Sequence, residues 1–267
     1  LASGGVSIAA LFLAGYVPGI LLGLALMGVV AVVAGKRGYP VGEKVGLQAA
    51  ARIFLGAVPS LFLIVLVMGG IILGWFTPTE ASAIAVAYTF VLSVLVYREI
   101  KWSELPRLLT DSAATTAIVL LLVGTSMGMS WVMSSANIPQ TITEVLLGLT
   151  DNKVVLLLMI NLLLLIVGMF MDMTPAVLIF TPILLPAVTK LGVSPLHFGL
   201  VMIFNLCLGL CTPPVGNCLF VGCGVAGTTI SRVWRPMVPL LIAAFAVLLA
   251  VTYWPALSLA LPKALGF

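Results

Sequence analysis

Long apolar stretches alternate with short polar gaps along the whole sequence. The apolar stretches cover residues 6–34, 54–75, 81–97, 112–136, 154–170, 175–189, 196–226 and 236–260. A run of about 20 apolar residues predicts a helix that crosses a bilayer, and backbone groups in lipid must be hydrogen-bonded within the protein. The pattern therefore predicts an all-α polytopic membrane protein.

The composition agrees with a bilayer as the solvent. Of 267 residues, 62% are hydrophobic and 7% are charged, whereas an ordinary soluble domain has about 25% charged residues. The first 34 residues contain neither a basic segment nor a small-residue cleavage site, so we expect no signal peptide. We expect instead a fragment of a longer protein that enters in mid-membrane.

The basic residues orient the predicted helices. Three gaps hold nine of the twelve Lys and Arg residues: Lys36, Arg37, Lys44 and Arg52; Arg98, Lys101 and Arg107; Arg232 and Arg235. The positive-inside rule places these gaps in the cytoplasm. This bias accounts for the net charge of +4, and no basic stripe with interleaved aromatic residues supports nucleic-acid binding.

Two short apolar stretches, 154–170 and 175–189, meet at a cluster of helix-breaking residues. The sequence there reads GMFMDMTPAVLIFTPILLPAV, from Gly168 to Val188. We expect a re-entrant hairpin that enters and leaves on the outer face, with its tip near Met171 to Pro175. A reversal at this depth costs several kcal/mol for each unpaired backbone group unless the tip is buried in protein or hydrated.

A second break interrupts the long stretch 196–226. The sequence GLCTPPVGNC, Gly209 to Cys218, has consecutive prolines. Because Pro213 and Pro214 lack an N–H, carbonyl groups one turn earlier lose their helical partners. Discontinuous helices that face each other at the membrane midplane are typical of the binding site of a secondary transporter.

The groups freed at the two breaks can bind ions of either charge. Free carbonyl groups and Thr hydroxyls can coordinate a hard cation, and a half-helix that begins near Thr174 presents N–H groups to an anion. Asp172 can add a carboxylate ligand, or it can cap the second hairpin arm. Simple proline kinks are the alternative for either break, and Asn161 and Asn205 can serve as interhelical hydrogen-bonding groups.

Two further features have local explanations. In GWFTPTEASA, Thr77, Pro78 and Glu80 match the N-cap, first position and third position of a helix with a capping box; alternatively, Thr79 or Glu80 faces a polar cavity. The four cysteines, Cys207, Cys211, Cys218 and Cys223, lie in apolar sequence without a neighbouring His. We interpret them as small buried hydrophobic residues rather than a metal site.

Several of these motifs together resemble one transporter family. They are LFLAGYVPGILLG, GWFTPTEASA, GMFMDMTPAVLIFTPILLP, GVSPLHFGLVMIFNLCLGLCTPPVG and the following LFV. In this order they resemble the large membrane subunit of tripartite ATP-independent periplasmic (TRAP) transporters. The resemblance implies two inverted repeats, an elevator mechanism and sodium-driven import of organic acids such as C4-dicarboxylates or sialic acids. It also implies two protein partners, a periplasmic substrate-binding protein and a small membrane subunit, and a location in the lipid bilayer of the bacterial inner membrane.

The resemblance divides the chain into five parts. It implies the end of the first repeat, a transmembrane helix and a cytoplasmic linker in 1–53, scaffold or arm helices in 54–150, the re-entrant hairpin in 151–192, the discontinuous helix in 193–235 and a C-terminal transmembrane helix in 236–267. The Na⁺ ligand candidates are Gly168, Met171, Asp172, Thr174, Gly209, Thr212 and Gly216. The substrate candidates are Thr174, Asn205, Pro213 and Asn217.

One part of the family pattern does not occur in this sequence. The first repeat of the family has a Ser-Gly-Ser-Ser hairpin tip and an Ile-Pro-Pro-Ser break, and neither is found here. We therefore expect about half of the substrate cavity in this chain. No cofactor beyond the coupling ion is implied.

Two other function classes were weighed. A sodium/carboxylate elevator carrier without a binding protein is the alternative to the TRAP subunit. A membrane enzyme is disfavoured because the sequence has no HExxH motif and its one His, His197, lies beside a predicted outer loop.

Overall fold

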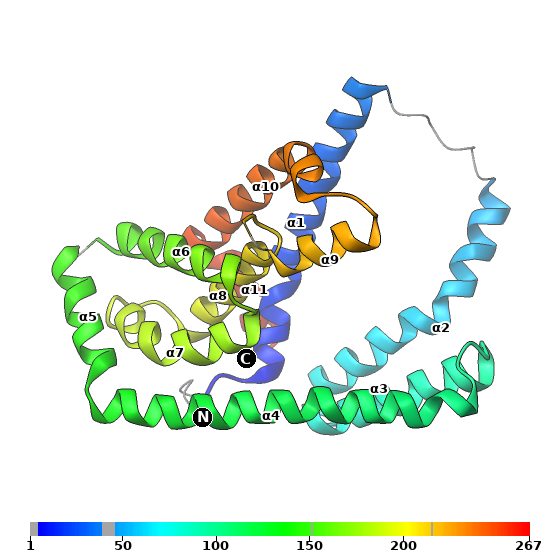
Figure 1. Cartoon of the computed structure of the whole chain (residues 1–267), viewed down its shortest axis with the longest axis horizontal. Coiled ribbons are helices and arrows are strands. Elements are labelled where there is room, and N and C mark those ends of the chain that lie inside the picture. Colours follow the sequence, from blue (N-terminus) through cyan, green and yellow to red (C-terminus); the bar gives the residue numbers. More distant parts are fainter. Residues whose placement is uncertain (1–4, 39–45, 151, 215) are drawn as a thin grey trace. The chain divides into compact units, whose positions relative to one another are not determined.

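The computed structural model describes residues 5–38, 46–150, 152–214 and 216–267. Within these ranges the chain forms helices joined by short connections (Figure 1), which confirms the all-α prediction. It divides into two compact units. One unit combines Leu1–Gly38 with Leu120–Phe267, and the other is Tyr39–Val119. We describe each unit by itself.

The main helices follow the predicted order. They are α1 (Ile8–Arg37), α2 (Leu47–Ile72), α3 (Pro78–Phe90), α4 (Leu105–Ser135), α5 (Ile138–Leu149), α6 (Lys153–Phe170), α7 (Met173–Lys190), α8 (Pro195–Leu210), α9 (Asn217–Val225), α10 (Ile230–Tyr253) and α11 (Ala256–Ala264). A π-helix (Val91–Val96) continues α3, and a 3₁₀ turn (Trp102–Glu104) precedes α4. Seven helices in the described part of the chain are long and apolar enough to span a membrane.

Two helical regions differ from the sequence pattern. The apolar stretch 236–260 is not one helix, because α10 ends at Tyr253 and α11 begins after Pro255. The short helix α5 lies in a predicted gap between apolar stretches, because polar residues interrupt its apolar run. Its residues Ile142 and Leu146 nevertheless pack against the core. Thr143 is fully buried, and its hydroxyl donates to Pro139 O at 2.7 Å. A search for long apolar runs cannot find an amphipathic helix of this kind.

The hairpin arms α6 and α7 and the following α8 form the larger core cluster. In Figure 1 they lie together in the green-to-yellow part of the ribbon. α6 and α8 run in the same direction, because Asn161 pairs with Asn205 and Gly168 packs against Gly209 further along both helices. The fully or almost fully buried side chains include Leu156, Ile160, Leu164, Leu184, Val188, Phe198, Met202 and Leu206.

A second cluster joins α8 to α1 and α10. Its buried side chains include Ala14, Val201, Leu208, Val247, Leu248 and Val251. α10 runs opposite to α8, because Thr252 near its end contacts His197 near the start of α8. α1 and α8 begin side by side, since Ser7 and Pro195 line one groove.

These directions separate the basic residues of this unit. At one end lie Lys36, Arg37, Arg232 and Arg235, and at the other lie Lys153, Lys190 and Lys263. All of them thus lie at the ends of the helices and outside the apolar spans, as membrane-spanning helices require. Which end faces the cytoplasm stays a prediction, and Lys44 lies outside the described residues.

A buried polar network ties the helices of this unit together. The Asn205 Nδ2 group donates to Asn161 O and Oδ1, both at 2.8 Å, and Asn161 Nδ2 donates to Thr252 Oγ1 at 3.1 Å. His197 lies 2.6 Å from Ser258 Oγ through Nδ1 and 3.1 Å from Thr252 O through Nε2. Because Thr252 O can only accept, His197 carries a proton on Nε2. The network confirms that Asn161 and Asn205 act as interhelical hydrogen-bonding groups.

The other unit contains α2 and α3, which pack through Tyr88. The Tyr88 hydroxyl donates to Pro59 O at 2.7 Å, and its ring lies against Phe62. The predicted capping box at the start of α3 is confirmed. Thr77 N donates to Glu80 Oε2 at 2.8 Å, and Glu80 N donates to Thr77 Oγ1 at 3.3 Å.

Replacement of Asn161 tests the polar network. In the Asn161→Ala variant of the full-length gene product, the amide of Asn205 loses a side-chain partner and the Thr252 hydroxyl loses a donor. We expect a loss of about 1–3 kcal/mol in the free energy of unfolding, the usual cost of a buried polar group left unsatisfied. Thermal unfolding in detergent measures it. Leu162→Ala is the matched control, because Leu162 is the next residue on α6 and 60% exposed; equal destabilisation by both variants would contradict the prediction.

Candidate functional site

The hairpin between α6 and α7 reverses over only two residues, Met171 and Asp172. Met171 N donates to Val167 O at 2.9 Å and closes the end of α6. Asp172 has an extended backbone at the N-cap position of α7, with φ −67° and ψ 155°, but its side chain makes no capping hydrogen bond. The carboxylate is exposed, so it is free for another partner at the tip.

The second break separates α8 from α9. Cys211 is the C-cap of α8, and Thr212 folds back so that its N–H donates to Gly209 O at 2.9 Å and its hydroxyl to Leu208 O at 2.7 Å. Pro214 stands where a helical donor to Leu210 O would be, and it has no N–H. The break ends at Gly216, whose φ of 48° and ψ of 86° lie in the left-handed region that favours glycine.

The two breaks touch each other through their backbones. A Cβ atom added to Gly209 would lie 2.7 Å from Gly168 Cα, and one added to Gly168 would lie 3.2 Å from Leu206 O. Gly216 N donates to Met169 O at 3.2 Å, directly from the break to the end of α6. The hairpin tip and the break are therefore one structural site, at the same level along α6 and α8.

Backbone oxygen atoms gather where the breaks meet. A Cβ atom on Gly216 would lie 2.9 Å from Thr212 O and 3.0 Å from Leu210 O. Neither of these carbonyl groups accepts a hydrogen bond from the described residues. The Thr212 hydroxyl is 6% exposed and, because its proton goes to Leu208 O, keeps its lone pairs for another ligand. Carbonyl and hydroxyl oxygens are the ligands of a hard cation.

The predicted ligand residues fall into distinct groups. Gly168, Gly209, Thr212 and Gly216 lie together and are buried. Met171, Asp172 and Thr174 lie at the tip and are partly or fully exposed, and Pro213 is partly exposed in the break. Their roles as ligands stay predictions.

The remaining predicted residues lie apart from these. Asn205 is fully buried one turn before Gly209. Its side-chain Nδ2 group donates to Asn161, and its Oδ1 has no hydrogen-bond partner in the described residues. Thr79 and Glu80 belong to the other unit and are exposed. The side chain of Asn217 lies outside the described parts of the structure.

The predicted ligand residues do not include Met169 and Leu210, whose carbonyl groups lie at the junction of the two breaks. For Leu210 a signal was present, since Pro214 is four residues later and removes the helical donor. For Met169 there was no signal, because its partner Gly216 is 47 positions away and only the fold brings the two together.

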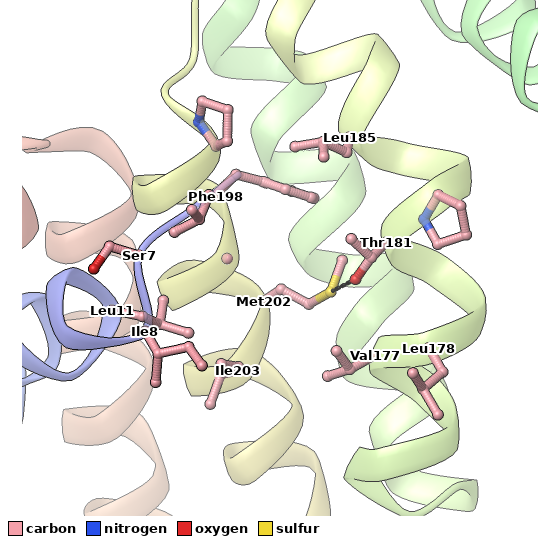
Figure 2. Close-up of a pocket in the computed structure, with 14 residues that line it drawn as sticks. Ser7, Ile8, Leu11, Val177, Leu178, Thr181, Leu185, Phe198, Met202 and Ile203 are labelled. Carbon is pink, nitrogen blue, oxygen red and sulfur yellow. Dashed lines mark hydrogen bonds between the residues drawn. The ribbon is translucent and has the colours of Figure 1, made fainter. Parts of the chain in front are cut away.

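A groove beside the site is chemically different. It has a volume of about 320 Å³ and lies between α7, α8 and the start of α1. Figure 2 shows Val177, Leu178, Thr181 and Leu185 across from Phe198, Met202 and Ile203, with Ser7, Ile8 and Leu11 beside them. The Thr181 hydroxyl donates to Met202 Sδ at 3.4 Å. A lining this apolar suits hydrocarbon and offers little to an ion.

The Gly168–Gly209 contact can be tested by adding one methyl group. In the full-length gene product, Gly209→Ala places a Cβ 2.7 Å from the backbone of α6. We expect the free energy of unfolding to fall by about 1–3 kcal/mol, as it does at other overpacked sites. Gly224→Ala is the control, because nothing lies within 4 Å of its added Cβ. Thermal unfolding in detergent compares them, and identical midpoints would show that α6 and α8 do not depend on this contact.

Comparison with known proteins gives one consistent family. The family model described as "Tripartite ATP-independent periplasmic transporter, DctM component" matches residues 1–257. The uncharacterized protein YgiK of Salmonella typhimurium is 55% identical over 262 residues, which are 98% of this chain and 60% of that protein.

Several relatives have names that include a substrate. The C4-dicarboxylate TRAP transporter large permease protein DctM of Pseudomonas aeruginosa is 39% identical over 97% of this chain and 61% of that protein. The sialic acid TRAP transporter large permease protein SiaM of Vibrio cholerae is 37% identical over 96% of this chain and 60% of that protein. The chain thus spans about three fifths of the length of these relatives. With its match from residue 1 to 257, this multi-pass membrane chain belongs to the DctM component family of the tripartite ATP-independent periplasmic transporters.

Proposed function

We propose that this chain is part of the large permease subunit of a sodium-coupled TRAP transporter that imports organic acids across the bacterial inner membrane. A periplasmic binding protein delivers the acid, and a small membrane subunit accompanies the permease. Family membership supports the transporter class. The relatives named for C4-dicarboxylate and sialic acid support an organic anion as substrate. The observation that carries the proposal is the meeting of two broken helices through Gly168, Gly209 and Gly216.

The relation of the two breaks supports a re-entrant hairpin. The hairpin tip lies level with the break between α8 and α9, and the chain continues from this break through α9 before it turns into α10. α9 has nine residues, about 14 Å of helix at 1.5 Å per residue. The start of α10, with Arg232 and Arg235, lies beyond it. This arrangement supports a hairpin tip that stops short of that end, at the depth where secondary transporters bind their substrates.

The oxygen atoms at the junction suit Na⁺. We assign its binding to the carbonyl groups of Leu210 and Thr212, the Thr212 hydroxyl and carbonyl groups at the end of α6 around Gly168. The carboxylate of Asp172, the carbonyl of Met171 and the hydroxyl of Thr174 lie at the tip and can complete the shell. The ends of α6 and α8 bring the negative poles of two helix dipoles to the same place, which favours a cation there.

The substrate carboxylate has complementary helix ends. α7 and α9 both begin at the junction, and neither N-cap residue, Asp172 or Gly216, provides a side-chain capping hydrogen bond. Their first N–H groups can bind a carboxylate. Thr174, Pro213 and Asn217 are the substrate candidates near these helix starts. The described lysines and arginines of this unit lie at its two ends, so the groups that this unit offers the anion are backbone N–H groups and uncharged side chains.

Transport itself is the first test. The full-length gene product, its small subunit and its binding protein are placed in proteoliposomes with labelled C4-dicarboxylate or sialate. We expect uptake only with an inward sodium gradient and with the binding protein present. Sodium-driven uptake without the binding protein would favour an independent elevator carrier. Absence of uptake of either acid, with both partners and the gradient present, would contradict the proposed function.

The Thr212 hydroxyl provides a test of the ion site. Thr212→Ala removes one oxygen ligand, and we expect the sodium concentration for half-maximal uptake to rise at least fivefold. Thr212→Ser keeps the hydroxyl and its bond to Leu208 O. Its sodium concentration for half-maximal uptake should therefore stay close to that of the unaltered protein. Uptake measured against sodium concentration at matched expression separates the two. An unchanged sodium dependence in Thr212→Ala would remove the hydroxyl from the ligand set.

A further inference from the structure

Three cysteine side chains line one cavity beside the break. The cavity has a volume of about 300 Å³ and is lined by Cys211, Cys218 and Cys223 together with residues such as Leu219, Val233 and Met237 from α9 and α10. From the sequence alone, all four cysteines are predicted to be small buried hydrophobic residues. The structure corrects this: Cys223 is buried, Cys211 is partly exposed, and Cys207 and Cys218 are exposed.

Cys211 and Cys218 bracket the break between α8 and α9. Cys211 is the C-cap of α8, and Cys218 is the second residue of α9. Both residues line the same cavity and both are at least partly exposed, whereas Cys223 in the same lining is buried. A disulfide requires the Cβ atoms to come to about 4 Å, and the shared cavity gives the two side chains a common space in which to approach each other.

Cys207 differs in its surroundings and provides a control within the chain. It lies one turn before Cys211 on α8, and its Sγ is 3.6 Å from Met173 Sδ at the start of α7. It does not contribute to the lining of the cavity beside the break. A reagent that joins Cys211 to Cys218 should therefore leave Cys207 outside the bond.

The break between the two thiols holds the groups assigned to the ion. Between Cys211 and Cys218 the chain makes the bonds from Thr212 to Gly209 and from Gly216 to Met169. Admission and release of an ion require these backbone groups to move, and helices that end at the break supply the freedom to do so. A covalent bond across the break would fix the two helix ends to each other and remove that freedom.

We propose that Cys211 and Cys218 form a thiol modification site, at which a small disulfide oxidant converts them to an intramolecular disulfide that arrests transport. One thiolate attacks the oxidant and releases its first thiol, and the second cysteine then displaces the other. One S–S bond forms in the protein and one breaks in the oxidant, which leaves as two thiols with the two protons. The effect on transport rests on the proposed function.

The test uses the full-length transporter in proteoliposomes and oxidised glutathione as the oxidant. Differential alkylation and mass spectrometry locate the disulfide, and uptake is measured on the same sample before oxidation, after it and after dithiothreitol. We expect a Cys211–Cys218 disulfide, at least a tenfold loss of uptake, and recovery on reduction. Cys211→Ser, Cys218→Ser and, as a second pair, Cys211→Ala and Cys218→Ala should keep their uptake through oxidation. Cys207→Ser should respond like the unaltered protein.

Several outcomes would overturn the proposal. These are the absence of a disulfide, a disulfide between another pair such as Cys211 and Cys223, and a complete Cys211–Cys218 disulfide that leaves uptake unchanged. The disulfide is detected without any transport assay. A sample that never takes up substrate would thus contradict the proposed function, while the location of the disulfide would still be decided.

Discussion

The close approach of α6 and α8 at Gly168 and Gly209 is the contact on which the candidate site depends. It places the hairpin tip and the interrupted helix at one level and lets Gly216 reach the carbonyl of Met169. In a bilayer, apolar side chains gain little from leaving lipid for protein, so helices associate through close packing and hydrogen bonds. Two glycines without side chains provide that packing at the point where the backbone is least regular. The glycines of this contact are buried, whereas Asp172 at the hairpin tip stays exposed.

The polar network supplies the second constraint. Asn161, Asn205 and Thr252 connect α6, α8 and α10 with side-chain hydrogen bonds in an otherwise apolar interior. Apolar packing alone tolerates several helix rotations, whereas a network of amides and hydroxyls has few arrangements in which its polar groups are satisfied. Asn205 Oδ1 is the exception, buried without a partner among the described atoms. The network therefore sets the rotation of α6 and α8, and the glycines set their separation.

The sequence predicts the helices well because the chemistry there is local. The prolines at positions 213 and 214, the Thr-Pro-Thr-Glu capping box and the two arms around Asp172 follow from missing N–H groups and helix-end preferences in neighbouring residues. The features that sequence reasoning missed depend on contacts between residues far apart in the sequence, or on which face of a helix packs against the core. The bond from Gly216 to Met169, the amphipathic α5 and the exposure of Cys218 come from how helices pack. The ligand roles of Thr174, Asp172 and Asn217 need an ion or substrate to define them, so no pattern of residues could have assigned them.

The polar network also bears on how the protein is made. Asn161 precedes Asn205 by 44 positions and Thr252 by 91, so during synthesis α6 reaches the membrane well before either partner exists. Its amide then lies in lipid or at the interface without the hydrogen bonds of the finished structure, a state that costs free energy until α8 and α10 follow. For α6 this state ends only when α10 has entered the membrane, so the three helices that share the network are completed together.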